Sequence, residues 1–269
     1  MKILKASDKD YAENLFSDSV YHNEHLGWLS LWQLPDIGGN IRLFEEASCK
    51  YLIGLQPVSE NIFWFHSFFS DSNPAQLHIS EALRSFFISG PRSIYAISSH
   101  KWFSSLLEEN GFRQFDEIIQ LETSCIIPPK YSARQDLYRF SSGISGMILS
   151  ECETSFPPLW RLGRFEWKTA LLNSNYACYS GSHGVPTGYI LADITEDNCH
   201  LLRIAVNQDN QQKGIASALV GSMINHCREI GITQYSVNTN KKNSAAVSFY
   251  NSLNYSQTGQ VFPIYHRYV

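Results

Sequence analysis

The sequence has no pair of closely spaced cysteines. Its six cysteines are Cys49, Cys125, Cys152, Cys178, Cys199 and Cys227, and none forms a Cys-x-x-Cys pair. The spacing that is typical of zinc sites is therefore absent, and a framework of disulfides is not indicated. We expect reduced cysteines, no bound metal and a cytoplasmic protein.

Long apolar runs and an excess of either charge are also missing. No apolar run approaches the roughly 18 residues that a membrane-spanning helix needs. The opening MKILKASDKDYAENLF lacks the apolar core of a signal peptide, which again favours the cytoplasm. Charged residues make up 17% of the chain and the net charge is −4. We therefore expect neither a nucleic acid nor a membrane as a partner.

The 269 residues are enough for one large or two small domains. The adjacent prolines in CIIPPKYSARQD (125–136) break regular structure and favour an extended linker. We therefore expect an N-terminal lobe over 1–125, a linker over 126–135 and a C-terminal lobe over 136–269.

The N-terminal lobe shows two strand patterns, each followed by a helical one. Asn61–Phe69 is too continuously apolar to alternate, which indicates a strand buried on both faces. An amphipathic helix is expected over Leu77–Phe87 and a second strand over Ser93–Ser98. Another helix ends within Trp102–Phe112, where Gly111 provides a left-handed stop.

The C-terminal lobe repeats this order with clearer signals. Apolar residues recur near 3.6-residue spacing from Ile215 to Ile230, which predicts a helix that Gly231 ends. Asn254 stands at a helix stop that requires a positive φ. The expected elements are strands at 176–179, 188–194, 199–206 and 233–239, helices at 214–230 and 243–254, and two strands within 255–269.

The two lobes resemble each other weakly where their last helices end, in LLEENGF and FYNSLNY. Aligning Gly111 with Asn254 places Leu107 opposite Tyr250 and His100 opposite Asn243. This pattern favours a duplication whose first copy has lost the polar residues that the second copy keeps.

The stretch VNQDNQQKGIASALV (206–220) joins a strand to a helix without a usual capping residue. Unpaired N–H groups and a partial positive charge at a helix start favour a phosphate. Gly214 and Ala216 keep side chains away from these groups. The stretch therefore predicts a phosphate-binding loop.

These residues resemble the phosphate loop of the GNAT superfamily of acyl-CoA N-acyltransferases. In that loop, a strand ending in Val is followed by Gln or Arg, two residues, Gly, one residue, and Gly or Ala. A second signature is matched by Asn243, Tyr250 and the stop Asn254-Tyr255, with Asn in place of the usual Gly. The resemblance covers roughly 136–269. It implies an α/β fold with two lobes, each a mixed, mostly antiparallel sheet flanked by helices, the first lobe being degenerate.

The resemblance also implies acetyl-CoA as the co-substrate, with its pantetheine arm along the strand that ends at Val206. The Tyr250 hydroxyl is the expected acid for the leaving thiolate, although an ordinary half-buried tyrosine is the alternative. Asn243 is either a coenzyme contact or only a helix cap. The expected coenzyme contacts are Leu202, Arg203, Ile204, Ala205, Val206, Gln211, Gln212, Lys213, Gly214, Ile215, Ala216, Ser217, Asn243, Ala246 and Tyr250.

No general base is assigned. Many relatives carry a glutamate on one of the two central strands, whereas the strand at 199–206 has none. His200, Asp193 and Glu196 lie near the end of the expected sheet, and His266 lies on the last strand. Each is expected to be structural rather than catalytic.

The acceptor is expected to be a primary amine. The run VNTNKKNSAAVSFY and the final YHRY are similar to the dTDP-fucosamine acetyltransferases, which act on nucleotide-linked amino sugars. A protein amino group or a small polyamine is the competing acceptor, and a non-catalytic coenzyme A-binding scaffold is the alternative of another class. The candidate acceptor contacts are Trp160, Arg161, Arg164, Asn238 and His266.

Overall fold

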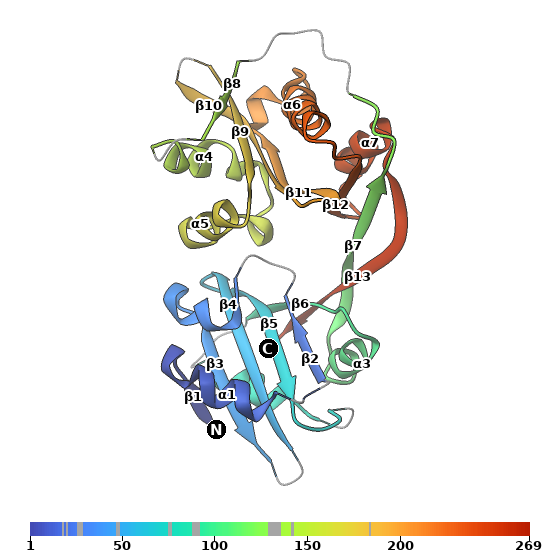
Figure 1. Ribbon diagram of the computed structural model, residues 1–269. Coiled ribbons are helices and arrows are strands. Elements are labelled where there is room, and N and C mark those ends of the chain that lie inside the picture. The colour runs from blue at the N-terminus through green and yellow to red at the C-terminus, as the bar shows by residue number, and fades with distance from the viewer. Residues whose placement is uncertain are drawn as a thin grey trace. The chain divides into compact units, whose positions relative to one another are not determined.

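The computed structural model describes the chain except residues 18, 20, 26–28, 47–48, 75–76, 88–91, 129–135, 141–142 and 183. Most of the linker expected at 126–135 lies outside the described residues. The chain forms two compact units (Figure 1). Unit 1 comprises Met1–Glu117 and Phe262–Val269, and unit 2 comprises Ile118–Val261.

Unit 1 contains a sheet in the order β1-β3-β4-β5-β6-β13, and β2 pairs with β5 off this path. Neighbouring strands are antiparallel except β5 and β6, which are parallel. Its elements are β1 (Lys2–Leu4), η1 (Ala6–Asp8), α1 (Lys9–Leu15), β2 (Tyr21–Glu24), η2 (Leu31–Ile37), β3 (Asn40–Glu45), β4 (Lys50–Ser59), β5 (Ile62–Ser70), α2 (Ser80–Ser85), β6 (Ser93–Ile97), α3 (Lys101–Glu109), the start of β7 (Arg113–Thr123) and the end of β13 (Ser256–Tyr268).

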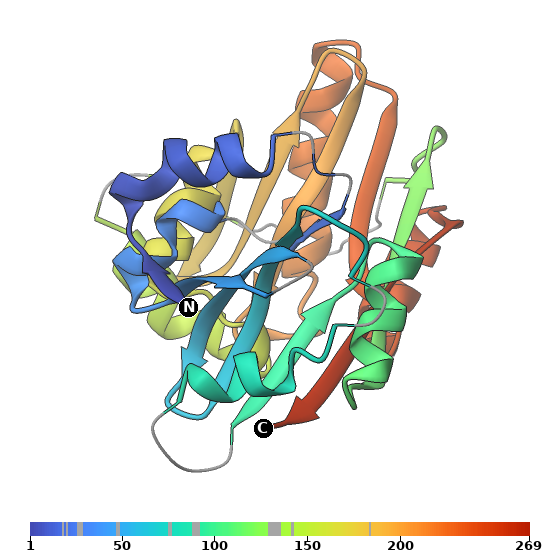
Figure 2. The ribbon, with the colours of Figure 1, turned by 90° about the horizontal axis from the view of Figure 1, so that it is seen from below.

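The core of unit 1 is aromatic. Phe65 of β5 contacts Phe103 of α3 edge-on, with ring centroids 5.5 Å apart, and both side chains are fully buried. Figure 2 shows α3 alongside β6 and the C-terminal end of β13. The Tyr265 hydroxyl of β13 donates to Glu108 Oε1 over 2.8 Å, which ties this last strand to α3.

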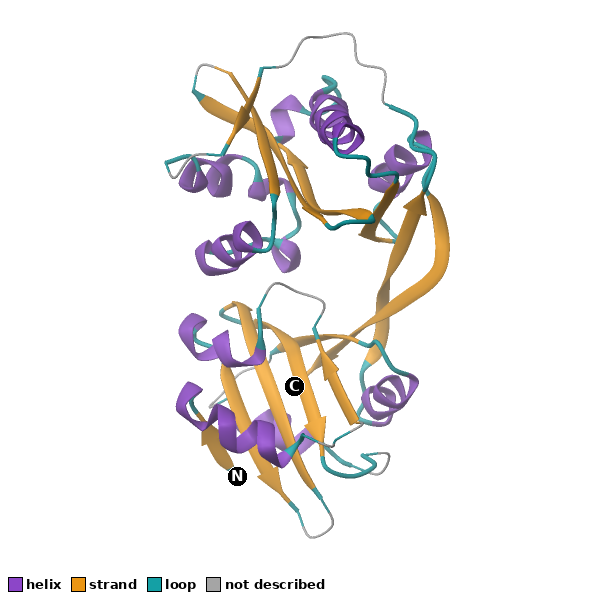
Figure 3. Cartoon of the chain, viewed as in Figure 1, coloured by secondary structure: helices purple, strands orange, loops and turns teal. Residues whose placement is uncertain are grey.

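Unit 2 contains a sheet in the order β8-β9-β10-β11-β12-β7, with β11 and β12 as its parallel pair. Figure 3 shows helices on both faces of this sheet. Its elements are the end of β7, β8 (Leu137–Arg139), α4 (Ser145–Glu151), η3 (Glu153–Ser155), η4 (Pro158–Trp160), α5 (Arg164–Leu172), β9 (Tyr176–Ser182), β10 (Val185–Ile194), β11 (Asn198–Val206), η5 (Gln208–Asn210), α6 (Ile215–Glu229), β12 (Gln234–Asn240), α7 (Ser244–Ser252) and the start of β13.

Helix α6 supplies the core of unit 2 because its apolar stripe faces the sheet. Ile215, Leu219, Met223 and Cys227 are all buried against residues of β10, β11 and β12. Ile230 was expected on the same stripe, but the helix ends at Glu229 and Ile230 is 54% exposed.

The expected fold class is confirmed: each unit is a mixed, mostly antiparallel sheet flanked by helices. The helix expected at 77–87 is confirmed only as the shorter α2. The two strands expected within 255–269 were wrong, since the segment forms the single strand β13. Gly259 adopts φ +89° within that strand and permits a local irregularity there. The strand β7 was not predicted.

The last helices of the two units have the same length and the same ends. α3 and α7 each contain nine residues and are preceded by His100 and Asn243, respectively. Gly111 has φ +77° and Asn254 has φ +70°, as the alignment of the two stops requires. This shared local conformation supports the duplication.

No helix in the described part of the chain is both long and apolar enough to cross a membrane. Among the same residues, no group of three or more His, Cys, Asp or Glu side chains is arranged to hold a metal ion.

Candidate functional site

The two parallel strands of unit 2 pair over a short length and then separate. Only residues Asn198–Leu201 of β11 pair with β12, and their partners are Gln234–Val237. Beyond this, β11 continues to Val206 along β10, and β12 continues to Asn240 along β7. Within the described residues, no strand pairs with the β12-facing edge of β11 after Leu201. Backbone donors and acceptors on that edge are available to an extended ligand.

A β-bulge lies where the strands begin to separate. Leu191 of β10 pairs with Arg203 and Ala192 pairs with Leu201, so Leu202 is an extra residue in β11. Bulges bend a strand and redirect the side chains that follow, and they are frequent beside active sites.

The bulge decides which face of the sheet Arg203 occupies. In a regular strand, Leu201 and Arg203 would share a face because side chains alternate. With Leu202 inserted, Leu201 before the bulge and Ile204 after it both pack on the α6 core. Arg203 is therefore directed to the opposite face.

The loop after β11 has the backbone conformation of an anion cradle. Gln212 has φ +60° and Gly214 has φ +78°, so two left-handed residues lie directly before α6. Gly214 is the N-cap of this 15-residue helix and has no side chain to cap it. The N–H groups of Ile215 and Ala216 belong to the first turn and have no acceptor within the helix. These groups and the helix dipole suit a phosphate.

Polar side chains brace the same loop. Gln211 Nε2 donates to the Val206 carbonyl over 3.3 Å, and Lys213 Nζ donates to Asn210 Oδ1 over 3.2 Å. Ser217, the last residue expected in the loop site, lies in the first turn of α6 and is partly buried.

Gly188 allows β11 and α6 to approach each other closely. A Cβ atom at this position of β10 would lie 2.9 Å from the Ala205 carbonyl oxygen and 2.9 Å from Ile215 Cγ2. Only glycine fits there without displacing the strand or the start of the helix.

Tyr250 of α7 lies in the same buried cluster as Ile215 and Leu201. It is 5% exposed, and its ring contacts Phe249 and Tyr255. Burial raises the pKa of the Tyr250 phenol well above its usual value. Within the described residues, no hydrogen bond of its hydroxyl is found. A neutral, unengaged phenol is suited to donate a proton.

Asn243 caps α7, because its side-chain oxygen accepts the Ala246 N–H over 3.1 Å. Asn243 was predicted to be either a coenzyme contact or only a helix cap, and the structure shows the cap. Asn238 is exposed on β12, immediately after the last residue that pairs with β11.

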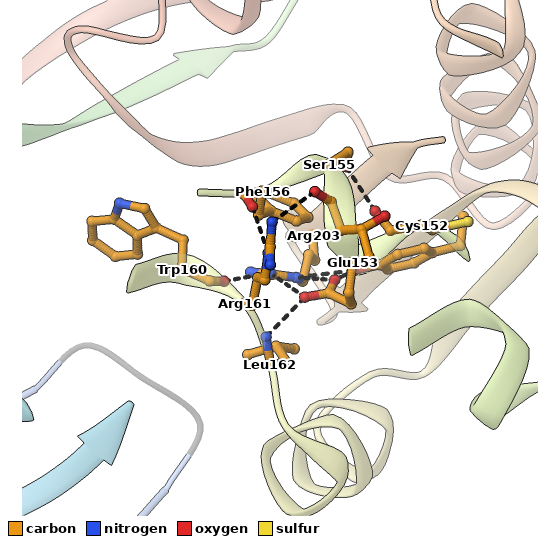
Figure 4. Close-up of polar contacts among 10 residues, drawn as sticks. Cys152, Glu153, Ser155, Phe156, Trp160, Arg161, Leu162 and Arg203 are labelled. Carbon is orange, nitrogen blue, oxygen red and sulfur yellow. Dashed lines mark hydrogen bonds and ion pairs between the residues drawn. The ribbon is translucent and has the colours of Figure 1, made fainter. Parts of the chain in front are cut away.

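The Arg203 side chain forms a buried ion pair that the sequence analysis missed (Figure 4). Its Nε and Nη2 atoms contact Glu153 Oε1 and Oε2 over 2.9 and 2.7 Å. Glu153 also accepts the Leu162 N–H over 2.8 Å and the Tyr189 hydroxyl. Arg203 Nη2 further donates to the Trp160 carbonyl over 2.6 Å. The Glu153 and Arg203 side chains are 2% and 10% exposed, so water screens the pair little.

The ion pair fastens the segment before α5 to β11. Burial alone would lower the pKa of Arg203, but Tyr189 and Glu153 together raise it above its usual value. The guanidinium lies 3.8 Å from the ring centroid of Phe156, which covers it. Arg203 thus contributes its side chain to structure, while its backbone remains on the open edge of β11. A charged residue within an otherwise apolar strand was the signal available in the sequence.

The candidate acceptor contacts divide between structural and exposed positions. Arg161 donates from Nε to the Phe156 carbonyl over 2.8 Å and from Nη2 to the Thr154 carbonyl over 3.1 Å. Arg164 is exposed at the start of α5, and Trp160 is partly buried in η4.

His266 lies in unit 1, not in the unit that contains the loop. Its ring contacts Tyr95, Phe115 and Tyr268, and its Nε2 atom is buried without a partner in the described part of the chain.

His200 takes part in a polar row on the sheet of unit 2. Its Nδ1 atom lies 2.8 Å from Ser236 Oγ of β12. On the other side, His200 is the cross-strand neighbour of Asp193 in β10. Burial lowers the pKa of His200, which favours the neutral ring at neutral pH. Glu196 is exposed in the turn after β10.

Comparison with known proteins identifies the class of the second unit. Residues 147–255 match the acetyltransferase (GNAT) family. N-acetyltransferase family 8 members 3 and 7 of Mus musculus are each 22% identical over 148 residues, with 46% of this chain covered. The chain spans 66% and 65% of the length of these two relatives.

Solved structures show the same fold over both units. A tandem GNAT protein from the clavulanic acid biosynthesis pathway has a TM-score of 0.61 at 9% identity, with 99% of this chain and 97% of that chain covered. A GCN5-related N-acetyltransferase from Sphaerobacter thermophilus has a TM-score of 0.56 at 11% identity, with 81% and 76% covered. The chain contains an acetyltransferase domain of the GNAT family, within unit 2. The expected class, an acyltransferase, is the class of this domain.

Proposed function

We propose that the protein transfers an acetyl group from acetyl-CoA to a primary amine, and that unit 2 carries the reaction. The observation that carries this proposal is the separation of β11 from β12. The open edge of β11 is followed by the loop that ends at Gly214, where α6 begins. An extended pantetheine arm would bind the open edge of Leu202–Val206, and the pyrophosphate would bind the first turn of α6. The family match supports acetyl-CoA as the donor.

Direct transfer would use the backbone of β11 and the Tyr250 side chain. The amine nitrogen attacks the thioester carbonyl, and a backbone N–H near the end of β11 would stabilise the oxygen that becomes negative. The Tyr250 hydroxyl would donate its proton to the leaving sulfur, forming the free thiol. Because burial raises the pKa of Tyr250, its phenol holds that proton at neutral pH. No residue is proposed as the general base. The proton that the attacking nitrogen loses would pass to water, and water would return a proton to Tyr250.

The acceptor is proposed to be a nucleotide-linked amino sugar, in line with the similarity of 237–250 and the final YHRY to that group of enzymes. The exposed Arg164 guanidinium would pair with a phosphate and the Trp160 ring would stack on a base. Arg161 contributes less to such a site, since two of its nitrogens already bind backbone carbonyls. The names of the two murine relatives specify no acceptor, so a protein or small amine is the second candidate.

The proposal is tested by release of the thiol from acetyl-CoA in the presence of an amine panel. The panel contains dTDP-linked amino sugars, a peptide with a free α-amine, a lysine peptide and a polyamine. Acetylated product and thiol in equal amounts with one amine class would establish both transfer and acceptor. Tight binding of acetyl-CoA without transfer to any amine would instead favour the non-catalytic scaffold.

A further inference from the structure

Unit 1 contains a pair of parallel strands arranged like the pair in unit 2. Only residues Ile62–Phe65 of β5 pair with β6, and their partners are Ser93–Ala96. β5 then continues to Ser70 while it stays paired with β4 on its other edge. The two strands therefore pair over four residues and separate, as β11 and β12 do.

In unit 1 the open edge is covered by the chain itself. β2 pairs antiparallel with the second half of β5, from Tyr21 opposite Ser70 to Glu24 opposite Ser67 (Figure 1). The His25 N–H continues this pairing by donating to the His66 carbonyl over 2.7 Å. β2 thus occupies the edge of β5 that β6 leaves.

Asn23 fastens β2 to the other strand of the pair. Its Nδ2 atom donates to the Ile97 carbonyl over 3.0 Å, at the end of β6. Its Oδ1 atom accepts the Ser99 N–H and the Ser99 hydroxyl, each over 3.0 Å. The Asn23 side chain is 1% exposed. One amide therefore satisfies a backbone acceptor and a backbone donor that a neighbouring strand would otherwise satisfy.

β2 also contacts α3, the helix that corresponds to α7 of unit 2. The Tyr21 ring meets Trp102 edge-on, with centroids 5.6 Å apart. The His22 ring lies 6.1 Å from that of His100, the residue that precedes α3. Where unit 2 places Tyr250, the alignment places Leu107, which is fully buried and carries no polar group.

The described residues between β5 and the end of α2 do not favour a phosphate. The helix after β5, α2, has six residues, whereas α6 has 15. The turn after β5 begins with Asp71, whose carboxylate accepts the Lys50 N–H over 2.9 Å. A short helix and a carboxylate at this turn do not favour an anion.

We propose that the space between β5 and β6 is a binding site for an extended peptide strand, and that residues 21–25 of the same chain occupy it permanently. Unit 1 is then closed to a coenzyme, and each chain binds one acyl donor, in unit 2. The first part of the proposal, that β2 fills the site, does not depend on the proposed function. The second part, one acyl donor per chain, rests on the proposed function of unit 2.

Hydrogen–deuterium exchange on the full chain tests this proposal. In the wild type, amides within 21–25 and 67–70 should exchange at least tenfold more slowly than in the unfolded chain, and saturating acetyl-CoA should not change them. Asn23→Ala should accelerate exchange within 21–25 at least tenfold. The matched variant Asn14→Ala, at an exposed position of α1, should leave it unchanged.

The wild-type measurement decides the proposal even where Asn23→Ala does not fold. Exchange within 21–25 at the rate of the unfolded chain would overturn it. A second outcome would also overturn it: amides within 67–70 of Gly214→Glu that are protected from exchange only when acetyl-CoA is added. Unit 1 would then bind the coenzyme. If the wild type binds no acetyl-CoA at all, the proposed function fails, and slow exchange within 21–25 would still support the occupied strand site.

Discussion

The Arg203 guanidinium binds the Glu153 carboxylate through two contacts of 2.9 and 2.7 Å, and both side chains are buried. The pair exists because the bulge at Leu202 directs Arg203 away from the α6 core. The same bulge begins the open edge of β11. The ion pair and the candidate coenzyme site are therefore two consequences of one inserted residue.

Removing one partner of this pair should destabilise the protein strongly. We expect Glu153→Ala to lower the free energy of unfolding by about 3–5 kcal/mol, because Arg203 would remain buried without a counter-charge. Urea denaturation measures the change. Glu196→Ala, at an exposed position, should change it by less than about 0.5 kcal/mol.

Removing both charges of the pair should cost less than removing one. The double variant Glu153→Leu with Arg203→Met should recover much of the stability that Glu153→Ala loses, because no unpaired charge remains buried. A Glu153→Ala variant as stable as the wild type would contradict the structural role given to the pair.

Tyr250→Phe should lower kcat by roughly 100-fold or more while leaving the Kd for acetyl-CoA unchanged, since only the proton donor is lost. Tyr255→Phe is the matched control, because Tyr255 is buried to 4% exposure and contacts the Tyr250 ring. Steady-state kinetics and a binding titration separate the two effects. Equal kcat values for both variants would remove Tyr250 from the mechanism.

The pH profile provides a second check on Tyr250. Burial favours the neutral phenol, so its pKa in the folded protein lies above the ordinary value of about 10. The phenol therefore stays protonated up to that pH. We therefore expect that ionisation of Tyr250 does not lower kcat below about pH 10. A fall in the wild-type kcat below that pH that is absent in Tyr250→Phe would contradict the assignment.

Gly188→Ala should destabilise unit 2 by roughly 1–3 kcal/mol, because the added Cβ would collide with the Ala205 carbonyl and with Ile215. It should also weaken acetyl-CoA binding, since β11 and the start of α6 are pushed apart. Gly146→Ala places a Cβ in open space within α4 and serves as the control. Thermal unfolding and titration test both expectations, and equal Tm values for the two variants would refute the close approach.

Acid should destabilise unit 1 through two buried histidines. Burial lowers the pKa of His25 to about 3 and that of His66 to about 4. The unfolded chain binds protons at these residues below about pH 6.5, whereas the folded chain does not, so stability falls as the pH falls toward 4. Each histidine contributes a slope of about 1.4 kcal/mol per pH unit.

His25→Phe isolates one of these contributions. Both ring nitrogens of His25 are buried without a partner among the described residues, so an apolar ring fits the same surroundings. The variant should lose the slope of one proton between pH 6.5 and 4, measured by urea denaturation at several pH values. The exposed His78→Phe should keep the full slope, and an unchanged slope in His25→Phe would contradict the assignment.

Local patterns predicted the elements that position the site. The apolar run before Val206, Gly214 at a helix start and Asn254 at a helix stop each specify a backbone conformation by themselves. The structure shows the strand that ends at Val206, a helix that begins directly after Gly214, and φ +70° at Asn254. The φ of +78° at Gly214 was not predicted.

Features that depend on contacts distant in sequence were not predictable. Glu153 and Arg203 are 50 residues apart, so the charge within the strand marks Arg203 but does not identify Glu153 as its partner. The four residues of β2 are too few and too polar to indicate a strand, since their pairing comes from β5 and from the Asn23 amide. The bulge at Leu202 likewise depends on the register with β10.

The most direct test of the account is a calorimetric titration with acetyl-CoA of the wild type, Gly214→Glu and Gly231→Glu. Both glycines have positive φ values, +78° and +85°, at opposite ends of α6, so both variants carry the same backbone strain. We predict one site per chain in the wild type and in Gly231→Glu, and no binding by Gly214→Glu. Equal binding by both variants, or none by the folded wild type, would contradict a coenzyme site at the start of α6.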